Sequence, residues 1–368
     1  MKVIFVITGI GMGHISRENA IIEKLKRNVK ELKISIIGNK KVCDYFRNKF
    51  DVTEIHGHNF PEGNFKVNLL KIIFHNLNYP FYYYHDYKII KNHIIQFNPD
   101  FLIVDSEPLG VKAGNLLGKK TFFVYNLDLD IWIEFNEHKK LTFMQKLQSK
   151  YFFKIIDYCY KNSTLVFLPG IKKKADAKNT RHVNPIIRKM PIELPDANTL
   201  MRKHRLEKKP ILITLGGSYF GKNIVEEIVE MSKNFDEEFA IFGYNEEKEI
   251  GNVRLFKFRE DFLEYLKICK GVIILAGHNS LMETIVYKKP ALVFPIKNYI
   301  EHYVNIYEYK EYIMYKLMKN KDFLKVHVEN FINAIPRLQE KLDRLEEIKG
   351  NGADEIVREI LFHSGNIA

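Results

Sequence analysis

Short apolar runs alternate with helical patterns along both halves of this 368-residue chain, and this alternation constrains its fold more than any other feature. The first half contains "KVIFVI", "KISIIG", "FLIVDS" and "TFFVYN", and the second contains "PILITLGG", "EFAIFG", "GVIILAG" and "PALVFPI". Such runs with helices between them are typical of βαβ units, whose strands form a parallel sheet. The sequence therefore predicts an α/β protein with two parallel-sheet domains.

The stretch between these two sets marks the domain junction. Residues Pro169 to Pro210 contain five prolines and a basic segment without a sustained hydrophobic period, which is typical of such a junction. The chain is long enough for two hydrophobic cores. We predict a first domain over residues 1–185 and a second over residues 186–345. A C-terminal helix within residues 346–368 is expected to pack back on the first domain.

The composition narrows the classes of partner and compartment. The formal net charge is +12 at pH 7, which favours an anionic partner or surface. No aromatic RNA-binding signature, zinc finger or basic zipper accompanies this charge, so we expect no nucleic-acid partner. Cys43, Cys159 and Cys269 lie far apart in the sequence. This spacing argues against a disulfide framework or a zinc site and fits a reducing cytoplasm.

Neither a secretory signal nor a membrane-spanning segment is predicted. Only a short apolar run separates Met1 from the first glycines, whereas a signal peptide has a longer apolar core and a small-residue cleavage site. No uncharged apolar stretch approaches the roughly 18 residues that a spanning helix requires. We therefore expect a cytoplasmic protein.

The turn after the first apolar run is rich in glycine. It reads "TGIGMGHISR" from Thr8 to Arg17, with three glycines at alternate positions and then His14. Glycines let the backbone approach a ligand here, and the following helix start offers N–H groups to an anion. A nicotinamide-dependent enzyme is disfavoured, because His14 replaces the third glycine of the dinucleotide fingerprint and "KISIIGN" ends without an acidic residue.

A second turn, "GGSYFGKN" from Gly216 to Asn223, also follows a predicted strand and precedes a helix. It is close to a Walker A sequence, but Asn223 replaces the hydroxyl residue that would ligate magnesium, and no later apolar strand ends in aspartate. An NTPase is therefore disfavoured. The pattern still predicts a phosphate-binding turn, in which Gly216, Gly217 and Ser218 offer backbone N–H groups and one hydroxyl.

The third turn, "AGHNSLMET" from Ala276 to Thr284, again follows an apolar run. Ser280 and Glu283 match an S-x-x-E capping box, in which each side chain bonds an N–H group at the helix start. The carboxylate of Glu283 is equally suited to bind two ribose hydroxyls. The sequence leaves both interpretations open.

Taken together, the three turns resemble, in order and separation, those of the GT-B glycosyltransferases of the MurG type. The resemblance is strongest in "ILITLGGS" and "GHNSLMETIVYKKPALVFPIKNYIEHYVN". It implies two Rossmann-like domains that face each other across a cleft. It also implies transfer of a sugar, expected to be an N-acetylhexosamine, from a UDP-sugar to a lipid-linked or cell-envelope acceptor, with inversion at the anomeric carbon.

The resemblance also assigns residues. The first loop lies near the diphosphate and acceptor, the GGS turn contacts the nucleotide, the backbone near Phe258 recognises uracil, and Glu283 binds ribose. The full set expected to bind the nucleotide-sugar is Gly11, Gly13, Arg188, Gly216, Gly217, Ser218, Phe258, Gly277, His278, Asn279, Ser280, Glu283, Glu301, His302 and Asn305.

Two departures from the family pattern affect this assignment. Glu301 and His302 stand where the family has a pair of glutamines that contact the sugar, which leaves the donor sugar open. In "VNPIIRK" an extra residue precedes Arg188, so the match of this arginine to the nucleotide-binding arginine of the family is weaker.

Three residues are candidates for the catalytic base. His14, Asp105 and Glu107 follow predicted strands of the first domain, and ligands of parallel sheets bind at the carboxyl ends of strands. His14 has the most suitable ordinary pKa for proton transfer near neutral pH. Its alternative role is to cap the helix or touch phosphate, and that of Asp105 is to cap the turn before a proline.

No metal or other cofactor is expected, because helix starts, loop amides and cationic side chains can stabilise a departing diphosphate. The sequence "DLD" from Asp128 to Asp130 mimics the motif of metal-dependent transferases, but that assignment leaves the three glycine turns unexplained. Two other functions remain open. One is a UDP-sugar 2-epimerase of the same architecture, and the other is a non-catalytic protein that binds sugar nucleotides.

Two amphipathic segments are candidates for contact with an anionic membrane surface. Residues Phe65 to His93 interleave aliphatic and aromatic residues with lysines, and residues Glu134 to Tyr158 show a weaker version of this pattern. Such faces dip into the interface while lysines meet anionic headgroups. The alternative is that both segments are ordinary core helices. We predict peripheral binding at the inner face of the cell membrane.

Overall fold

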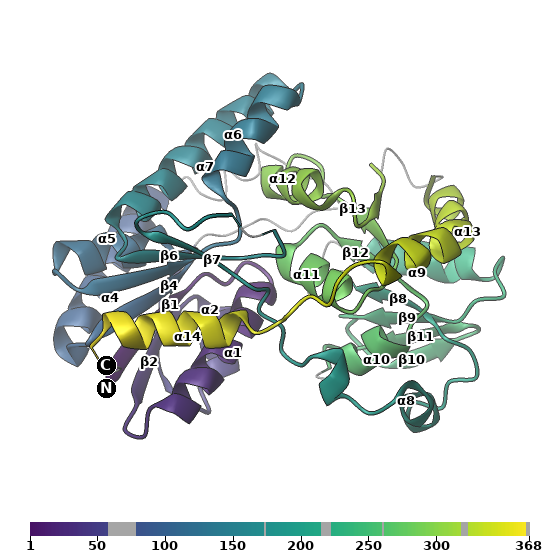
Figure 1. The fold of residues 1–368 in the computed structure, drawn as a ribbon, viewed down its shortest axis with the longest axis horizontal. Helices are drawn as coiled ribbons and strands as arrows, with labels where there is room; N and C mark the ends of the chain where they lie inside the picture. Colours follow the sequence, from purple (N-terminus) through teal and green to yellow (C-terminus); the bar gives the residue numbers. More distant parts are fainter. Residues whose placement is uncertain (58–78, 173, 215–221, 260, 318–322, 366–368) are drawn as a thin grey trace. The chain divides into compact units, whose positions relative to one another are not determined.

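The computed structural model describes residues 1–57, 79–172, 174–214, 222–259, 261–317 and 323–365 (Figure 1). These residues form two compact units, each with its own sheet. The division falls after Arg188, and the chain returns to the first unit at Asn351. Each unit is therefore described by itself below.

The first unit is built on a seven-stranded sheet in the order β3-β2-β1-β4-β5-β6-β7. All neighbouring strands are parallel. The strands are β1 (Lys2–Ile7), β2 (Lys33–Gly38), β3 (Asp51–Glu54), β4 (Phe101–Asp105), β5 (Lys120–Val124), β6 (Leu165–Pro169) and β7 (Thr180–Val183). The helices are α1 (Gly13–Asn28), α2 (Lys40–Phe46), α4 (Tyr79–Phe97), α5 (Pro108–Leu116), α6 (Leu129–His138), α7 (Phe143–Asn162) and α14 (Gly352–His363).

The C-terminal helix α14 belongs to this unit. It packs against α1, and its Ile356, Val357 and Ile360 are buried in the same hydrophobic cluster as Val3 and Phe5 of β1. These three residues lie on one helix face because they are spaced by one, three and four positions. The first unit is therefore closed by a segment that follows the whole second unit in the sequence.

The second unit repeats the architecture with the sheet order β10-β11-β9-β8-β12-β13-β14. Its strands are parallel except for the antiparallel pair β10 and β11. The strands are β8 (Ile211–Thr214), β9 (Phe239–Phe242), β10 (Lys248–Ile250), β11 (Val253–Phe256), β12 (Gly271–Leu275), β13 (Ala291–Phe294) and β14 (Met314–Tyr315). The helices are α8 (Ala197–Lys203), α9 (Lys222–Ser232), α10 (Phe262–Ile268), α11 (His278–Val286), α12 (Ile300–Tyr309) and α13 (Phe323–Asp343), with a short 3₁₀ turn at Pro191–Glu193.

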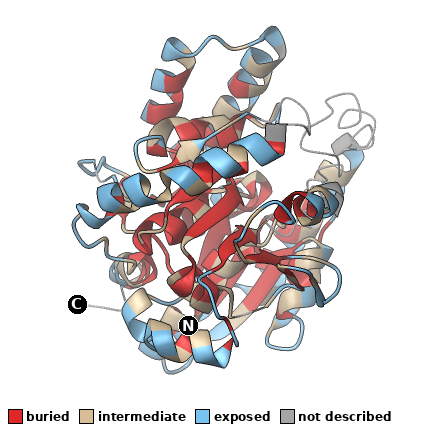
Figure 2. Cartoon of the chain, turned by 90° about the vertical axis from the view of Figure 1, so that its right-hand side faces the viewer, coloured by how far each residue is buried: buried red, intermediate tan, exposed pale blue. Residues whose placement is uncertain are grey.

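The central strands of both sheets are apolar and buried (Figure 2). Strands covered by helices on both faces read as continuous apolar runs, which is why β4, β6 and β12 are buried at every position. The prediction of an α/β chain with two parallel-dominated sheets is confirmed. None of the helices in the described part of the chain is long and apolar enough to cross a membrane.

The strand order defines where a ligand fits in each unit. Open parallel sheets bind ligands beyond the carboxyl ends of their strands, at the point where the winding of the chain reverses direction. In the first unit this point lies between β1 and β4, and in the second it lies between β8 and β12. The three glycine-rich turns of the sequence follow β1, β8 and β12.

Candidate functional site

The loop between β1 and α1 needs its glycines for two different reasons. Gly11 has a φ of +76°, a conformation that costs an L side chain energy. A Cβ atom on Gly9 would lie 1.8 Å from Oδ1 of Asn39, so a larger residue there would displace the Asn39 side chain, whose Oδ1 accepts a hydrogen bond from the amide of Val42 at the start of α2. Met12 precedes α1 and makes no side-chain capping bond, which leaves the capping of the helix start to other groups.

His14 and Asp105 meet at the switch point of the first sheet. Ile7 at the end of β1 pairs with Asp105 at the end of β4, so the turn after β1 carries α1 past the Asp105 carboxylate. Nδ1 of His14 lies 2.8 Å from Oδ1 of Asp105. The Asp105 side chain is fully buried, whereas the His14 side chain retains 16% of its exposure.

Arg17 completes the contact with this carboxylate. Its Nε donates to Oδ2 of Asp105 over 2.9 Å, and its Nη2 donates to Oδ1 over 2.5 Å. Burial disfavours the charged form of Asp105, but the positive charge of Arg17 and the contacts with His14 outweigh it. The pKa of Asp105 is therefore held well below its ordinary value, and the group is an anion at neutral pH.

Glu18 adds a second carboxyl to the cluster. Its side chain is completely buried, and it interacts with the carboxylate of Asp105. Burial, followed by repulsion from Asp105, raises the pKa of Glu18 well above its ordinary value. The environment therefore favours the neutral form of Glu18 and the charged form of Asp105.

Arg17 and Glu18 were not among the site residues predicted from the sequence. A signal for both was present, because residues three and four positions after His14 lie on the same face of a helix.

The contact between His14 and Asp105 is suited to proton transfer. When His14 donates through Nδ1 to Asp105, its Nε2 carries the lone pair and can accept a proton, and the anion stabilises the resulting imidazolium.

Glu107, the third predicted catalytic residue, lies apart from this cluster. It is the N-cap of α5, where its carboxylate accepts a hydrogen bond of 3.3 Å from the amide of Leu109. Its side chain is buried, and burial chiefly raises its pKa to about 7. The hydrogen bond of Glu107 therefore caps the start of α5.

This raised pKa predicts a pH-dependent stability. Between about pH 4.5 and 7 the folded protein keeps a proton on Glu107 that the unfolded chain has released, so stability falls as pH rises through this window. Glutamine mimics the protonated acid at every pH. Glu107→Gln is therefore expected to raise the free energy of unfolding at pH 8 by up to about 3 kcal/mol and to leave it nearly unchanged at pH 4. Urea unfolding of both proteins between pH 4 and 8, in buffer that contains EDTA, measures the free energy of unfolding. The prediction would be contradicted if this free energy changed with pH in the same way for the wild type and for Glu107→Gln.

In the second unit, α11 begins directly after β12, at the switch point of its sheet. Its N-cap is Gly277, and a Cβ atom there would meet open space. Ser280 therefore lies inside the first turn and Glu283 in the second, so the capping-box interpretation of these two residues is wrong. The S-x-x-E pattern predicted a helix that starts after Ser280, whereas α11 already starts at His278. Glu283 is largely buried, with 8% of its surface exposed.

Helix α12 brings Glu301, His302 and Asn305 to the same sheet. Asn305 is fully buried, and its Nδ2 donates to the carbonyl of Ala276 over 2.9 Å, which ties α12 to the turn before α11. His302 is also buried, and its Nδ1 accepts a hydrogen bond from the amide of Ile296. Burial lowers the pKa of His302 to about 4, so this histidine is neutral. Glu301 accepts a hydrogen bond of 2.7 Å from the hydroxyl of Tyr299.

The remaining predicted residues are placed as follows. Phe258 follows β11 and is 55% exposed. Arg188 is half-buried and is the last residue of the first unit before the division. Gly216, Gly217 and Ser218 lie outside the described residues. Gly277, His278, Asn279, Ser280 and Glu283 come together at the start of α11.

The "DLD" sequence has a structural explanation. Asp128 is the N-cap of α6 and accepts a hydrogen bond of 2.8 Å from the amide of Asp130. Its other oxygen pairs with Lys174 at 2.9 Å. These contacts give the first aspartate a structural role at the start of α6.

Comparison with known proteins gives consistent matches. The sequence profile of Glycosyl transferase family 1 matches residues 1–336. An uncharacterized glycosyltransferase of Methanopyrus kandleri is 30% identical over 128 residues, a match that covers 33% of this chain and 37% of that protein. The chain thus matches little more than a third of the length of this relative.

Solved structures match over nearly the whole chain. MurG of Acinetobacter baumannii has a TM-score of 0.60 at 13% identity and is matched over 98% of this chain and 99% of its own. A UDP-glucosyltransferase from Polygonum tinctorium has a TM-score of 0.68 at 11% identity, with coverages of 99% and 98%. The S. aureus MnaA–UDP co-structure has a TM-score of 0.63 at 14% identity, with coverages of 100% and 97%. At these identities the similarity concerns the fold.

Proposed function

Because the chain belongs to glycosyl transferase family 1 and has the GT-B fold, we propose that it transfers a sugar from a UDP-sugar to a lipid-linked acceptor. The observation that carries the proposal is the contact between His14 and the buried Asp105 anion at the switch point of the first sheet. A partly exposed imidazole held by a buried anion is the arrangement that a general base requires.

The proposed reaction is a single displacement. An acceptor hydroxyl loses its proton to Nε2 of His14, and its oxygen forms a bond to the anomeric carbon while the bond from that carbon to the UDP oxygen breaks. UDP leaves with the electron pair, and the anomeric configuration inverts. Asp105 stabilises the imidazolium that forms, and Arg17 keeps Asp105 ionised.

The second unit is proposed to bind the donor at the start of α11. Gly277 leaves open space there, and the helix N-terminus favours a negatively charged diphosphate. We propose that this arrangement stabilises the leaving group without a metal ion. The fold shared with the S. aureus MnaA–UDP co-structure and with a UDP-glucosyltransferase supports UDP as the nucleotide.

A ligand screen tests the donor class. UDP and UDP-sugars are expected to raise the melting temperature of the protein, because a ligand that binds only the folded state stabilises it by mass action. ADP and GDP at the same concentration serve as controls. Equal shifts with all three nucleotides, or none with UDP, would contradict a uridine-specific site.

Glu283 is the proposed ribose ligand. Glu283→Ala is expected to weaken UDP binding by about 1–3 kcal/mol, because a carboxylate that binds two ribose hydroxyls makes charge-assisted hydrogen bonds. Isothermal titration calorimetry with UDP measures this, and a thermal melt without ligand serves as the folding control. An unchanged UDP affinity together with a lowered melting temperature would assign Glu283 a structural role instead.

Helix α7 supports the proposed membrane contact. Phe143, Leu147 and Tyr151 recur every fourth residue and are 79%, 54% and 57% exposed. Lys146, Lys150 and Lys154 form an exposed row beside them. An apolar row flanked by lysines fits a surface of anionic lipid. Of the other predicted segment, residues 65–78 lie outside the described residues, and Phe81 and Tyr84 on α4 are exposed.

The α7 surface can be tested with vesicles. Replacing Phe143, Leu147 and Tyr151 together with serine is expected to lower binding to vesicles of one-third phosphatidylglycerol by at least about 10-fold, since three apolar groups no longer enter the interface. Co-sedimentation measures the effect, with neutral phosphatidylcholine vesicles as the comparison. The same substitution type at Ile192, which is 88% exposed in the second unit, serves as the control. Equal binding by the triple variant and the wild type would exclude this face.

A further inference from the structure

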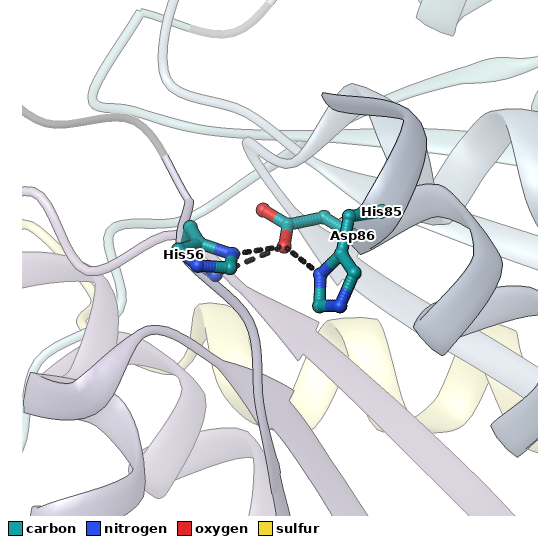
Figure 3. A group of neighbouring side chains, drawn as sticks. All are labelled: His56, His85 and Asp86. Carbon is teal, nitrogen blue, oxygen red and sulfur yellow. Dashed lines mark hydrogen bonds and ion pairs between the residues drawn. The ribbon is translucent and has the colours of Figure 1, made fainter. Parts of the chain in front are cut away.

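Outside the predicted site, two histidines and an aspartate converge in the first unit (Figure 3). His56 lies just after β3, and His85 and Asp86 are neighbours on α4. Nδ1 of His56 lies 2.9 Å from Oδ1 of Asp86, and Nδ1 of His85 lies 3.7 Å from the same oxygen. One ligand atom from each residue lies within 4.8 Å of the other two.

These separations suit a small divalent cation. Ligand atoms bound at about 2.0–2.1 Å to a tetrahedral Zn²⁺ lie roughly 3.3 Å apart. The two separations from Asp86 Oδ1 bracket this value. Two imidazoles and one carboxylate are also a donor set that Zn²⁺ takes in proteins when a fourth position stays open.

Asp86 is held in place by the backbone around it. Its side chain is 2% exposed, and its two oxygens accept hydrogen bonds from the amides of His56 at 3.1 Å and Gly57 at 2.9 Å. The ring of His56 stacks on Tyr82 with 4.3 Å between ring centres. Such outer contacts orient metal ligands before the ion binds. The imidazoles of His56 and His85 are 44% and 59% exposed, so an ion reaches them from solvent.

We propose that His56, His85 and Asp86 form a binding site for Zn²⁺ or a similar divalent transition-metal ion, with solvent completing the coordination. The ion takes the place of the proton between His56 Nδ1 and Asp86, and the imidazole proton moves to Nε2. The site joins the end of β3 to α4 and therefore connects segments on either side of residues 58–78. This role is separate from the proposed transfer chemistry at His14.

The test uses full-length protein without an affinity tag, treated with EDTA and then dialysed. Isothermal titration with zinc sulfate is expected to show one equivalent bound and a rise in melting temperature. His85→Ala is expected to weaken zinc binding by at least about 10-fold, since it removes one of three ligands. His138→Ala is the matched control, because His138 is an exposed histidine at the end of α6. This variant is expected to bind zinc like the wild type.

A second measurement keeps the test independent of folding. Cobalt(II) bound at the site is expected to give visible absorption bands of nitrogen and oxygen ligation that His56→Gln abolishes. Unliganded melting temperatures of the variants establish that they fold. Equal zinc affinity of His85→Ala and wild-type protein, or the absence of binding in the wild type, would overturn the proposal.

Discussion

Replacing His14 with alanine is expected to lower kcat by about 10²- to 10⁴-fold while KM for the UDP-sugar changes little. The imidazole is the group that accepts the proton of the acceptor hydroxyl in the proposed reaction, and its Nδ1 is held by Asp105 at 2.8 Å. Without it, the hydroxyl must lose its proton to water. Steady-state kinetics with varied donor and acceptor measure the two parameters separately.

A matched control separates chemistry from folding. His138→Ala removes an exposed histidine of the same unit and is expected to retain wild-type kcat. A His14→Ala protein with unchanged kcat and raised KM would show that His14 binds substrate and does not transfer a proton.

Asp105→Asn is expected to lower the free energy of unfolding by about 3–5 kcal/mol at pH 7, because it leaves the buried guanidinium of Arg17 without its anion. It is also expected to lower kcat, since a neutral amide no longer stabilises the imidazolium of His14. Urea unfolding at several pH values measures the first effect. The matched control is Asp354→Asn, whose carboxylate pairs with Lys24 at 2.8 Å on the surface and is expected to contribute less than about 1 kcal/mol.

The contribution of Asp105 to the free energy of unfolding is expected to depend on pH in one direction. The pKa of Asp105 is depressed in the folded protein, so its stabilising contribution is present above the unfolded value near pH 3.9 and is lost as pH falls through the folded value. The difference in the free energy of unfolding between the wild type and Asp105→Asn is therefore expected to persist down to about pH 4. A difference that vanishes between pH 7 and 5 would contradict an ionised, paired Asp105.

Glu18 affects how far the Asp105→Asn substitution lowers the free energy of unfolding. Once the charge of Asp105 is removed, the main source of repulsion on Glu18 disappears, and its carboxyl can ionise beside Arg17. The decrease in the free energy of unfolding is then expected to be about 3 kcal/mol for Asp105→Asn alone and about 5 kcal/mol for the Asp105→Asn, Glu18→Gln double variant. Strict additivity of the two single substitutions would show that Glu18 and Asp105 do not interact.

The fold class could be predicted from the sequence, and the three catalytic-base candidates could be named from it. Alternating apolar runs and helical patterns predict two parallel sheets, and the carboxyl ends of parallel strands share one edge. That rule places His14 and Asp105 at the same edge of the sheet, and the structure adds that the strands before them are neighbours. Arg17 and Glu18 were not predicted, because the glycine-rich turn by itself does not indicate which residues lie on the helical face that begins after it.

Other features depend on tertiary contacts that a local pattern does not contain. The capping-box pattern at Ser280 is real, but α11 begins at His278, so the pattern lies within the helix. The group formed by His56, His85 and Asp86 joins residues about 30 positions apart. Its convergence depends on how α4 packs beside β3, and no spacing in the sequence predicts it.

Analysis of the reaction products distinguishes sugar transfer to a lipid from epimerisation of the UDP-sugar. The full-length protein is incubated with a radiolabelled UDP-N-acetylhexosamine and a membrane lipid extract, and UDP, free UDP-sugars and solvent-extracted lipid are measured together. We expect label in the lipid fraction with an equal amount of UDP, and loss of both with His14→Ala. A new free UDP-sugar without UDP release would establish an epimerase, and the absence of every product across the UDP-sugars would contradict a transferase.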